Sequence, residues 1–201
     1  MRLAELDKGV TPLGLWAESR ARLEGLAAYR LICASYAGKV ARRSGVPYLN
    51  HVQEGVYMLV RTLGWRERVV AAYCVHPIFQ SDRSMSRVLD GGIDARGLAV
   101  EEVVLAMEYR RVANAYVSTM RPKAVDEIEL SPLAEVNAML VADKVQNKKD
   151  FMGHMFKRVG RASYARASDR YVGYFESWLE RLGVSAEVYG VLEAELKWVG
   201  G

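Results

Sequence analysis

The stretch AAYCVHPIFQSD, residues 71–82, sets one histidine at the end of an apolar run. The run extends from Val69 to Val75, His76 follows it, and Pro77 opens a more polar segment. Burying a titratable imidazole costs free energy unless the ring is hydrogen-bonded or bound to a metal. The residues around His76 are therefore the first candidates for a functional site.

Two other stretches carry residues that could meet His76. RRSGVPYLNHVQEG contains His51, and VADKVQNKKD contains Asp143. The three residues lie on three separate predicted helices, each flanked by apolar residues. Imidazoles and a carboxylate that converge in a helical core would form a metal site with open positions. On spacing alone, a hydrogen-bonded core histidine and a buried ion-pair aspartate explain the same residues, and that is the commoner situation.

Composition indicates one globular domain over residues 1–201. Hydrophobic residues make up 51% of the 201 positions and charged residues 26%, which excludes a disordered chain. No apolar run approaches the ~18 residues of a membrane span. The N-terminus has no apolar signal core, and Cys33 and Cys74 sit among apolar neighbours like free thiols. We therefore expect a cytoplasmic location.

The net charge of +4 suits a phosphorylated ligand. Basic residues gather only in Lys157–Arg170, which is typical of a solvated helix face. A nucleic-acid partner is therefore a weak third hypothesis. Trp178 and Trp198 could pack internally or against a second subunit, so an oligomer stays open.

Helical periodicity pervades the chain, and strand signals are nearly absent. We predict an all-α bundle of about seven or eight helices. Loops are expected at Arg42–Pro47, at residues 78–99 as a long segment of the kind that forms lids, and at Arg121–Leu130. The expected helices are Leu15–Ala41, Tyr48–Leu63 ended by Gly64, Trp65–His76 ended by Pro77, Val100–Met120, one opened by Ser131 and Pro132, Phe151–Val159, Ala162–Leu182 and Ser185–Trp198.

Three motifs resemble a known family, the HD-domain superfamily. RRSGVPYLNH resembles the R-x-S-G-x-P-Y-x-x-H signature in the hydrolase domain of RelA/SpoT-type alarmone enzymes and of the small alarmone hydrolases. VADKVQNKKD resembles the A-D-[KR]-x-x-N segment of these enzymes, and AAYCVHPIFQSD stands where they have A-A-L-L-H-D-x-x-E-D. The resemblance spans roughly Ala27 to Asp150 and implies an HD-type helical fold.

The resemblance also implies roles for individual residues. His51, His76 and Asp143 match metal ligands for Mn as the first choice, with Fe or Zn as the alternatives. Arg42 and Tyr48 match residues that bind the nucleotide base. Asn147 and Gln80 are the expected catalytic residues: Asn147 shares the ligand face of its helix, and Gln80 stands at the first position of the family's Glu-Asp pair.

The chain also departs from the family pattern. Pro77 replaces the aspartate of the His-Asp pair, which removes a metal ligand. Gln80 and Ser81 replace the Glu-Asp pair that activates water. Glu54 and Asp82 are candidates to substitute, although Glu54 is better explained as a surface carboxylate.

Two functions follow from the resemblance. The first is a metal-dependent phosphohydrolase acting on a nucleotide, for example a guanosine alarmone. The second is a catalytically inactive HD fold that binds a nucleotide or a protein partner, because synthetase-only members of the family lose the same His-Asp pair.

Overall fold

The computed structural model describes residues 10–40, 46–117, 124–158, 172–197 and 199. Within these ranges the regular elements are helical, which confirms the predicted all-α fold. None of the helices in the described part of the chain is long and apolar enough to cross a bilayer. The helices are α1 Pro12–Glu24, α2 Ala27–Tyr36, α3 Tyr48–Leu63, α4 Glu67–Gln80, α5 Asp82–Leu89, α6 Val100–Val117, the short 3-10 helix η1 Val125–Glu127, α7 Ala134–Arg158, an unlabelled helix over 172–181, and α9 Ala186–Leu196.

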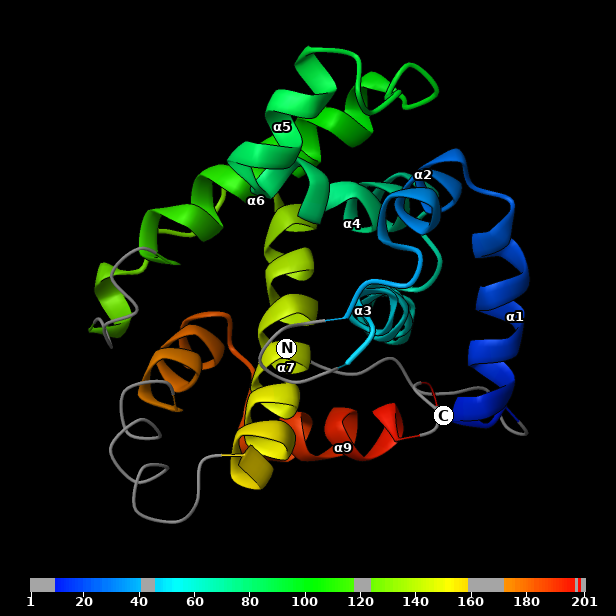
Figure 1. The fold of residues 1–201 in the computed structure, drawn as a ribbon. Coiled ribbons are helices and arrows are strands. Elements are labelled where there is room, and N and C mark those ends of the chain that lie inside the picture. The colour runs from blue at the N-terminus through cyan, green and yellow to red at the C-terminus, as the bar shows by residue number, and fades with distance from the viewer. Residues whose placement is uncertain (1–9, 41–45, 118–123, 159–171, 198, 200–201) are drawn as a thin grey trace.

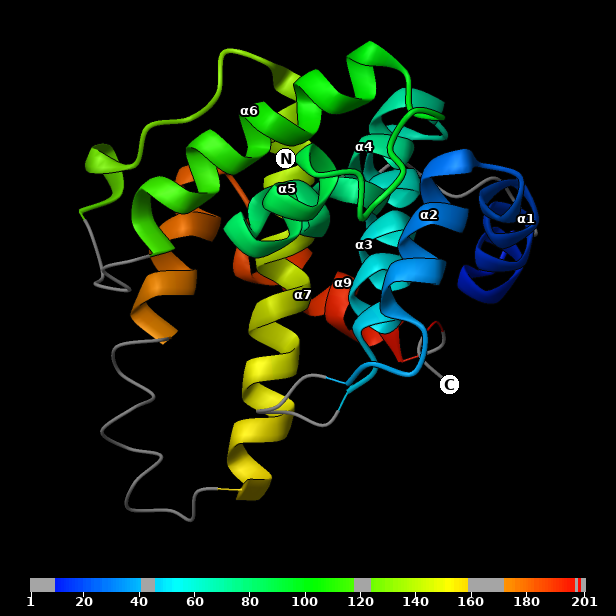
Figure 2. The ribbon, with the colours of Figure 1, turned by 45° about the horizontal axis from the view of Figure 1, so that its top comes forward.

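Helix α4 lies at the centre of the fold. It contacts α2, α3, α5, α6 and α7, and its residues from Val69 to Phe79 are buried apart from Pro77. The long α7 runs beside α3, with α9 packed against both (Figure 1). Helix α6 lies across α4 and α7 (Figure 2). Because α3, α4 and α7 contact one another, side chains on their facing sides can meet.

Two predicted helix boundaries are confirmed, the end of α3 and the start of α9. Gly64 ends α3 with a φ of 69°, a left-handed conformation that glycine adopts without strain. Ser185 caps α9 and accepts a hydrogen bond from the Val188 N–H at 3.2 Å.

Trp178 is buried, and the ammonium of Lys144 lies 5.1 Å from the centre of its ring. This tryptophan therefore packs inside the chain.

The predicted helix Leu15–Ala41 is wrong, because the chain breaks between α1 and α2. Leu26 is extended, with φ −79° and ψ 134°. Gly25 before it weakens a helix, and Arg30 donates to the freed Gly25 carbonyl at 2.7 Å. The break lets α1 pack on α3 while α2 packs mainly on α4.

The predicted end of α4 at His76 is also wrong, since the helix continues through Pro77 to Gln80. The carbonyls at its end find donors on α6. Arg110 donates to the carbonyls of Phe79 at 2.8 Å and Gln80 at 3.0 Å, and Asn114 donates to the Gln80 carbonyl at 3.1 Å. These bonds satisfy the acceptors that a helix end leaves open.

Three further boundaries differ from the predictions. The expected loop over 78–99 contains α5, capped by the Ser81 hydroxyl, which accepts from the Ser84 N–H at 3.4 Å. The helix expected to open at Ser131 begins at Ala134. The Ser131 hydroxyl donates to Glu108 at 2.7 Å and accepts from the Leu133 N–H at 3.1 Å, and the first helical N–H groups bond to the Leu133 carbonyl. The separate helix expected from Phe151 is the continuation of α7. Most of Lys157–Arg170, the start of the predicted helix Ala162–Leu182, and Trp198 lie outside the described residues.

Candidate metal centre

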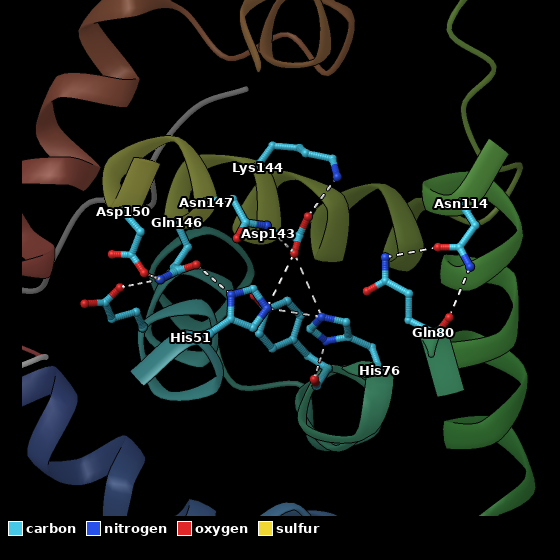
Figure 3. Close-up of polar contacts among 11 residues, drawn as sticks. His51, His76, Gln80, Asn114, Asp143, Lys144, Gln146, Asn147 and Asp150 are labelled. Carbon is cyan, nitrogen blue, oxygen red and sulfur yellow. Dashed lines mark hydrogen bonds and ion pairs between the residues drawn. The ribbon is translucent and has the colours of Figure 1, made fainter. Parts of the chain in front are cut away.

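His51 and His76 face each other in the core. His51 projects from the first turns of α3 and His76 from the last turns of α4, and their Nε2 atoms lie 3.3 Å apart (Figure 3). Two imidazole nitrogens bound to one ion at about 2.1 Å lie about 3.0 Å apart in octahedral geometry and about 3.4 Å apart in tetrahedral geometry. The spacing of the two rings therefore suits a shared ion.

Asp143 completes the group from α7. Its Oδ1 lies 3.5 Å from Nε2 of His51 and 3.9 Å from Nε2 of His76, and the three candidate ligand atoms all lie within 4.8 Å of one another. The structure thus brings together the three residues that the sequence named as ligands. They form a set of two imidazoles and one carboxylate that could hold a divalent ion.

Gln146 determines which nitrogen of His51 carries the proton. Its amide nitrogen donates to Oε2 of Glu54 at 3.0 Å and to Oδ2 of Asp150 at 2.7 Å, so its oxygen must face the other way. That oxygen lies 2.6 Å from Nδ1 of His51. An amide oxygen is only an acceptor, so Nδ1 carries the hydrogen. Nε2 of a neutral His51 then presents a lone pair to the site.

Pro77 contributes to the same arrangement at His76. A residue at this helical position normally donates its N–H to the carbonyl of residue 73, but proline has no N–H. The Tyr73 carbonyl instead lies 2.6 Å from Nδ1 of His76 and can only accept. The proton of a neutral His76 therefore also sits on Nδ1, and its Nε2 is free to bind an ion.

With both rings in the neutral tautomers that Gln146 and the Tyr73 carbonyl favour, three electron-rich atoms converge with no proton between them. Burial lowers the pKa of His76 to about 3, with the neighbouring His51 acting in the same direction, so the ring is neutral at physiological pH. Two imidazole lone pairs and a carboxylate oxygen repel one another unless a cation lies between them. A divalent metal ion bound between the three atoms would remove this repulsion, so the residues suit such an ion.

Asp143 is held on both oxygens. Lys144 donates to Oδ2 at 2.9 Å, and Asn147 donates to Oδ1 at 2.9 Å. Burial opposes ionisation of Asp143, but the Lys144 ammonium and the imidazoles outweigh it and lower the pKa of the carboxyl to about 2. The carboxylate is therefore ionised, and its Oδ1 is oriented toward the histidines.

The centre opens to solvent beside His51. The His51 side chain is 20% exposed, whereas those of His76 and Asp143 are 1% and 5% exposed. His51 is therefore the one candidate ligand among the described residues that solvent partly reaches. Tyr48 lies one turn before His51, is 37% exposed and packs against the Tyr36 ring at 5.2 Å between centroids. Arg42, the other expected base-binding residue, lies outside the described residues.

The two expected catalytic residues have different environments. Asn147 contacts the ligand atom of Asp143, so it positions the carboxylate. The Gln80 amide donates to Oδ1 of Asn114 at 3.1 Å and is directed toward α6, to the side of the three ligands (Figure 3).

The two carboxylates considered as substitutes have other partners. Glu54 was expected at the surface, but it is 3% exposed. It is bound by Gln146 and by Lys149, because α7 covers this face of α3. Asp82 pairs with Arg110 at the start of α5.

Several residues of the site were missed from the sequence. Gln146 and Asp150 follow Asp143 by three and seven residues, and their partner Glu54, which was considered only as a substitute ligand, follows His51 by three, spacings that repeat along one helix face. This periodicity was a signal that the polar face of α7 meets α3. Tyr73 and Tyr109 also flank the site, and their sequence pattern is that of ordinary core residues.

Comparisons of the chain with protein-family models, with curated proteins and with solved structures gave no match. Membership of the HD-domain superfamily therefore remains a prediction from the three sequence motifs. The geometry of His51, His76 and Asp143 supports a metal centre independently of that resemblance.

Proposed function

We propose that this protein is a divalent-cation-dependent phosphohydrolase that acts on a nucleotide in the cytoplasm. The observation that carries the proposal is the convergence of two Nε2 atoms and one carboxylate oxygen in a buried centre that is partly exposed at His51. The resemblance of the three motifs to those of alarmone hydrolases indicates a nucleotide as the substrate class. Manganese is the first choice of ion, with iron or zinc as the alternatives.

When bound, the cation would lower the pKa of a water molecule and polarise a phosphoryl oxygen. The chain supplies the remaining functions. Gln146 and the Tyr73 carbonyl hold the imidazoles in the ligating tautomer, and Asn147 fixes the carboxylate. The ring of Tyr48, 37% exposed and one turn from His51, would stack on a nucleotide base.

Turnover by the purified protein tests this function. The protein is loaded with Mn²⁺ and incubated with a panel of nucleotides that includes guanosine 3′-diphosphate esters, and the products are separated. We expect release of phosphate or pyrophosphate, loss of turnover in Asp143→Asn, and loss on chelation of the metal. Absence of turnover with every nucleotide, in protein shown to contain Mn²⁺, would contradict the proposal.

A second candidate function is a non-hydrolysing HD fold that binds a nucleotide or a protein. The specific observation in its favour is that Gln80 and Ser81, which stand where the family has its water-activating acids, make structural hydrogen bonds in this chain. Gln80 binds Asn114, and Ser81 caps α5. Pro77 likewise offers no ligand.

Calorimetry with nucleotides on the metal-free and the Mn²⁺-loaded protein separates the two candidates. Nucleotide binding without turnover supports the regulator. The double variant Pro77→Asp, Gln80→Glu should then gain hydrolysis if only the acidic groups are missing. A wild-type protein that already hydrolyses the nucleotide it binds would eliminate the regulator.

A further inference from the structure

Two tyrosine rings enclose His76. The Tyr73 ring, from one turn earlier on α4, lies 4.5 Å from the His76 ring between centroids, and the Tyr109 ring, from α6, lies 4.6 Å away. Both tyrosines are fully buried. His76 is therefore held between two phenols that belong to different helices.

Neither hydroxyl makes a well-oriented hydrogen bond to a described residue; the Tyr109 hydroxyl lies close enough to the Asp143 carboxylate to interact with it, and the Tyr73 hydroxyl has no such neighbour among these residues. A buried hydroxyl without a partner loses its interaction with water and gains nothing in return. Tyr57, equally buried on α3, shows the usual solution, because its hydroxyl donates to Oε2 of Glu195 at 2.9 Å. The hydroxyls beside His76 thus require an explanation that packing does not give.

Both hydroxyls belong to the surroundings of the metal centre. The tip of Tyr73 lies against Gly55, one helical turn after His51, where a Cβ atom would come within 2.1 Å of the hydroxyl oxygen. Burial raises the pKa of Tyr109 well above its usual value, and the nearby Asp143 carboxylate raises it further. For Tyr73 the causes come in the same order, burial first and Asp143 next. After burial, Asp143 thus has the largest influence on both phenols.

We propose that the hydroxyls of Tyr73 and Tyr109 bind the solvent ligands of a cation held by His51, His76 and Asp143. This inference rests on the proposed function. Three protein ligands leave open positions on a six-coordinate ion such as Mn²⁺, and water fills them. A buried water molecule needs two to four polar partners, and a phenol offers one donor and an acceptor. The water molecules bound to the ion would then be the hydrogen-bond partners of the two tyrosine hydroxyls.

The test compares Tyr73→Phe and Tyr109→Phe with Tyr57→Phe as the matched control. Each full-length protein is stripped of metal, its thermal unfolding is recorded with and without Mn²⁺, and Mn²⁺ is titrated calorimetrically. For the two site variants we expect an unchanged or higher melting temperature without metal, because a hydroxyl without a well-oriented hydrogen bond has been removed. We expect Mn²⁺ affinity to fall about tenfold, as for other groups that support metal ligands. Tyr57→Phe should melt at a lower temperature and bind Mn²⁺ like the wild type.

Either of two results would overturn the inference. A melting temperature that falls in metal-free Tyr73→Phe and Tyr109→Phe, as in the control, would mean that the hydroxyls have protein partners. Unchanged Mn²⁺ affinity in both variants would mean that they do not serve the ion. A wild-type protein that binds no Mn²⁺ defeats the proposed function first, and this inference with it, so the two failures are distinguishable.

Discussion

At the scale of single residues, Gln146 links the acidic groups Glu54 and Asp150 to His51. The two carboxylates accept from the Gln146 amide and so fix its orientation, and the amide oxygen in turn fixes the tautomer of the His51 imidazole. Replacing the amide would leave His51 without this restraint, and Lys149 would be the partner of Glu54 that remains among the described residues.

We predict that Gln146→Leu weakens Mn²⁺ binding about 10- to 100-fold, the usual effect of losing a partner of a metal-ligating histidine. The matched control is Gln53→Leu, which removes a glutamine of α3 that donates to the Tyr29 hydroxyl. Calorimetric titration measures both affinities, and ¹⁵N NMR of the imidazoles reports the tautomer of His51. Equal affinities in the two variants would show that Gln146 has no positioning role.

The sequence identified His51, His76 and Asp143 as one group because their motifs resemble a family pattern. It did not identify Gln146 or the buried position of Glu54. An amide and a carboxylate are ordinary surface residues until a second helix covers them, and the α3–α7 contact is a tertiary property that a single helix pattern does not contain.

At the scale of elements, α4 shows a proline retained inside a helix. Proline in a helix interior costs roughly 3 kcal/mol relative to alanine. Part of that cost is offset here, because His76 donates to the carbonyl that Pro77 leaves open. The predicted helix end at His76 is wrong for two reasons: His76 replaces the donor that Pro77 lacks, and α6 supplies donors to the carbonyls at the end of α4.

We predict that Pro77→Ala stabilises the metal-free protein by about 1–3 kcal/mol and weakens Mn²⁺ binding several-fold. The backbone N–H that alanine restores at this position would donate to the Tyr73 carbonyl and compete with Nδ1 of His76. Chemical denaturation and calorimetric titration measure the two effects. Pro132→Ala, outside the helices and exposed, is the control and should change neither quantity. A variant that gains stability but keeps the full Mn²⁺ affinity would show that Pro77 has no influence on the metal site.

Gly55 shows the same dependence on packing between elements. Glycine in a helix interior is normally less stable than alanine by about 1 kcal/mol. At Gly55, however, a Cβ atom would collide with the ring of the buried Tyr73.

We predict that Gly55→Ala destabilises the protein by about 1–2 kcal/mol, because overpacking costs more than helix propensity returns. Gly190→Ala on α9, where a Cβ atom would meet nothing within 4 Å, should stabilise it by about 0.5–1 kcal/mol. Urea denaturation of the two variants compares them directly. A stabilised Gly55→Ala would show that Tyr73 can move away at little cost.

At the scale of the whole molecule, the candidate ligands join three helices that are far apart in the chain. Helical periodicity was enough to predict the all-α fold, since most of the helices carry apolar residues at helical spacing. The break between α1 and α2 and the presence of α5 were not predicted, because they depend on which neighbour each segment packs against.

A cation at this centre should therefore stabilise the entire fold. A ligand that binds only the native state raises the free energy of unfolding by about 2.7 kcal/mol at one hundred times its dissociation constant. We predict that the melting temperature of the wild type rises with Mn²⁺ concentration, whereas that of His51→Ala does not. Equal shifts in the two proteins would indicate binding elsewhere on the chain.

The most direct measurement of the central claim is calorimetric titration of Mn²⁺ into metal-stripped wild type, His51→Ala and His154→Ala, with elemental analysis of each protein as purified. His51 is the most exposed of the three ligands, so its replacement is the least disruptive to the core. We predict one ion per chain in the wild type and in His154→Ala, and a loss of binding in His51→Ala. A wild-type protein that binds no divalent ion, or a His51→Ala variant that binds as the wild type does, would contradict the claim that His51, His76 and Asp143 form a metal centre.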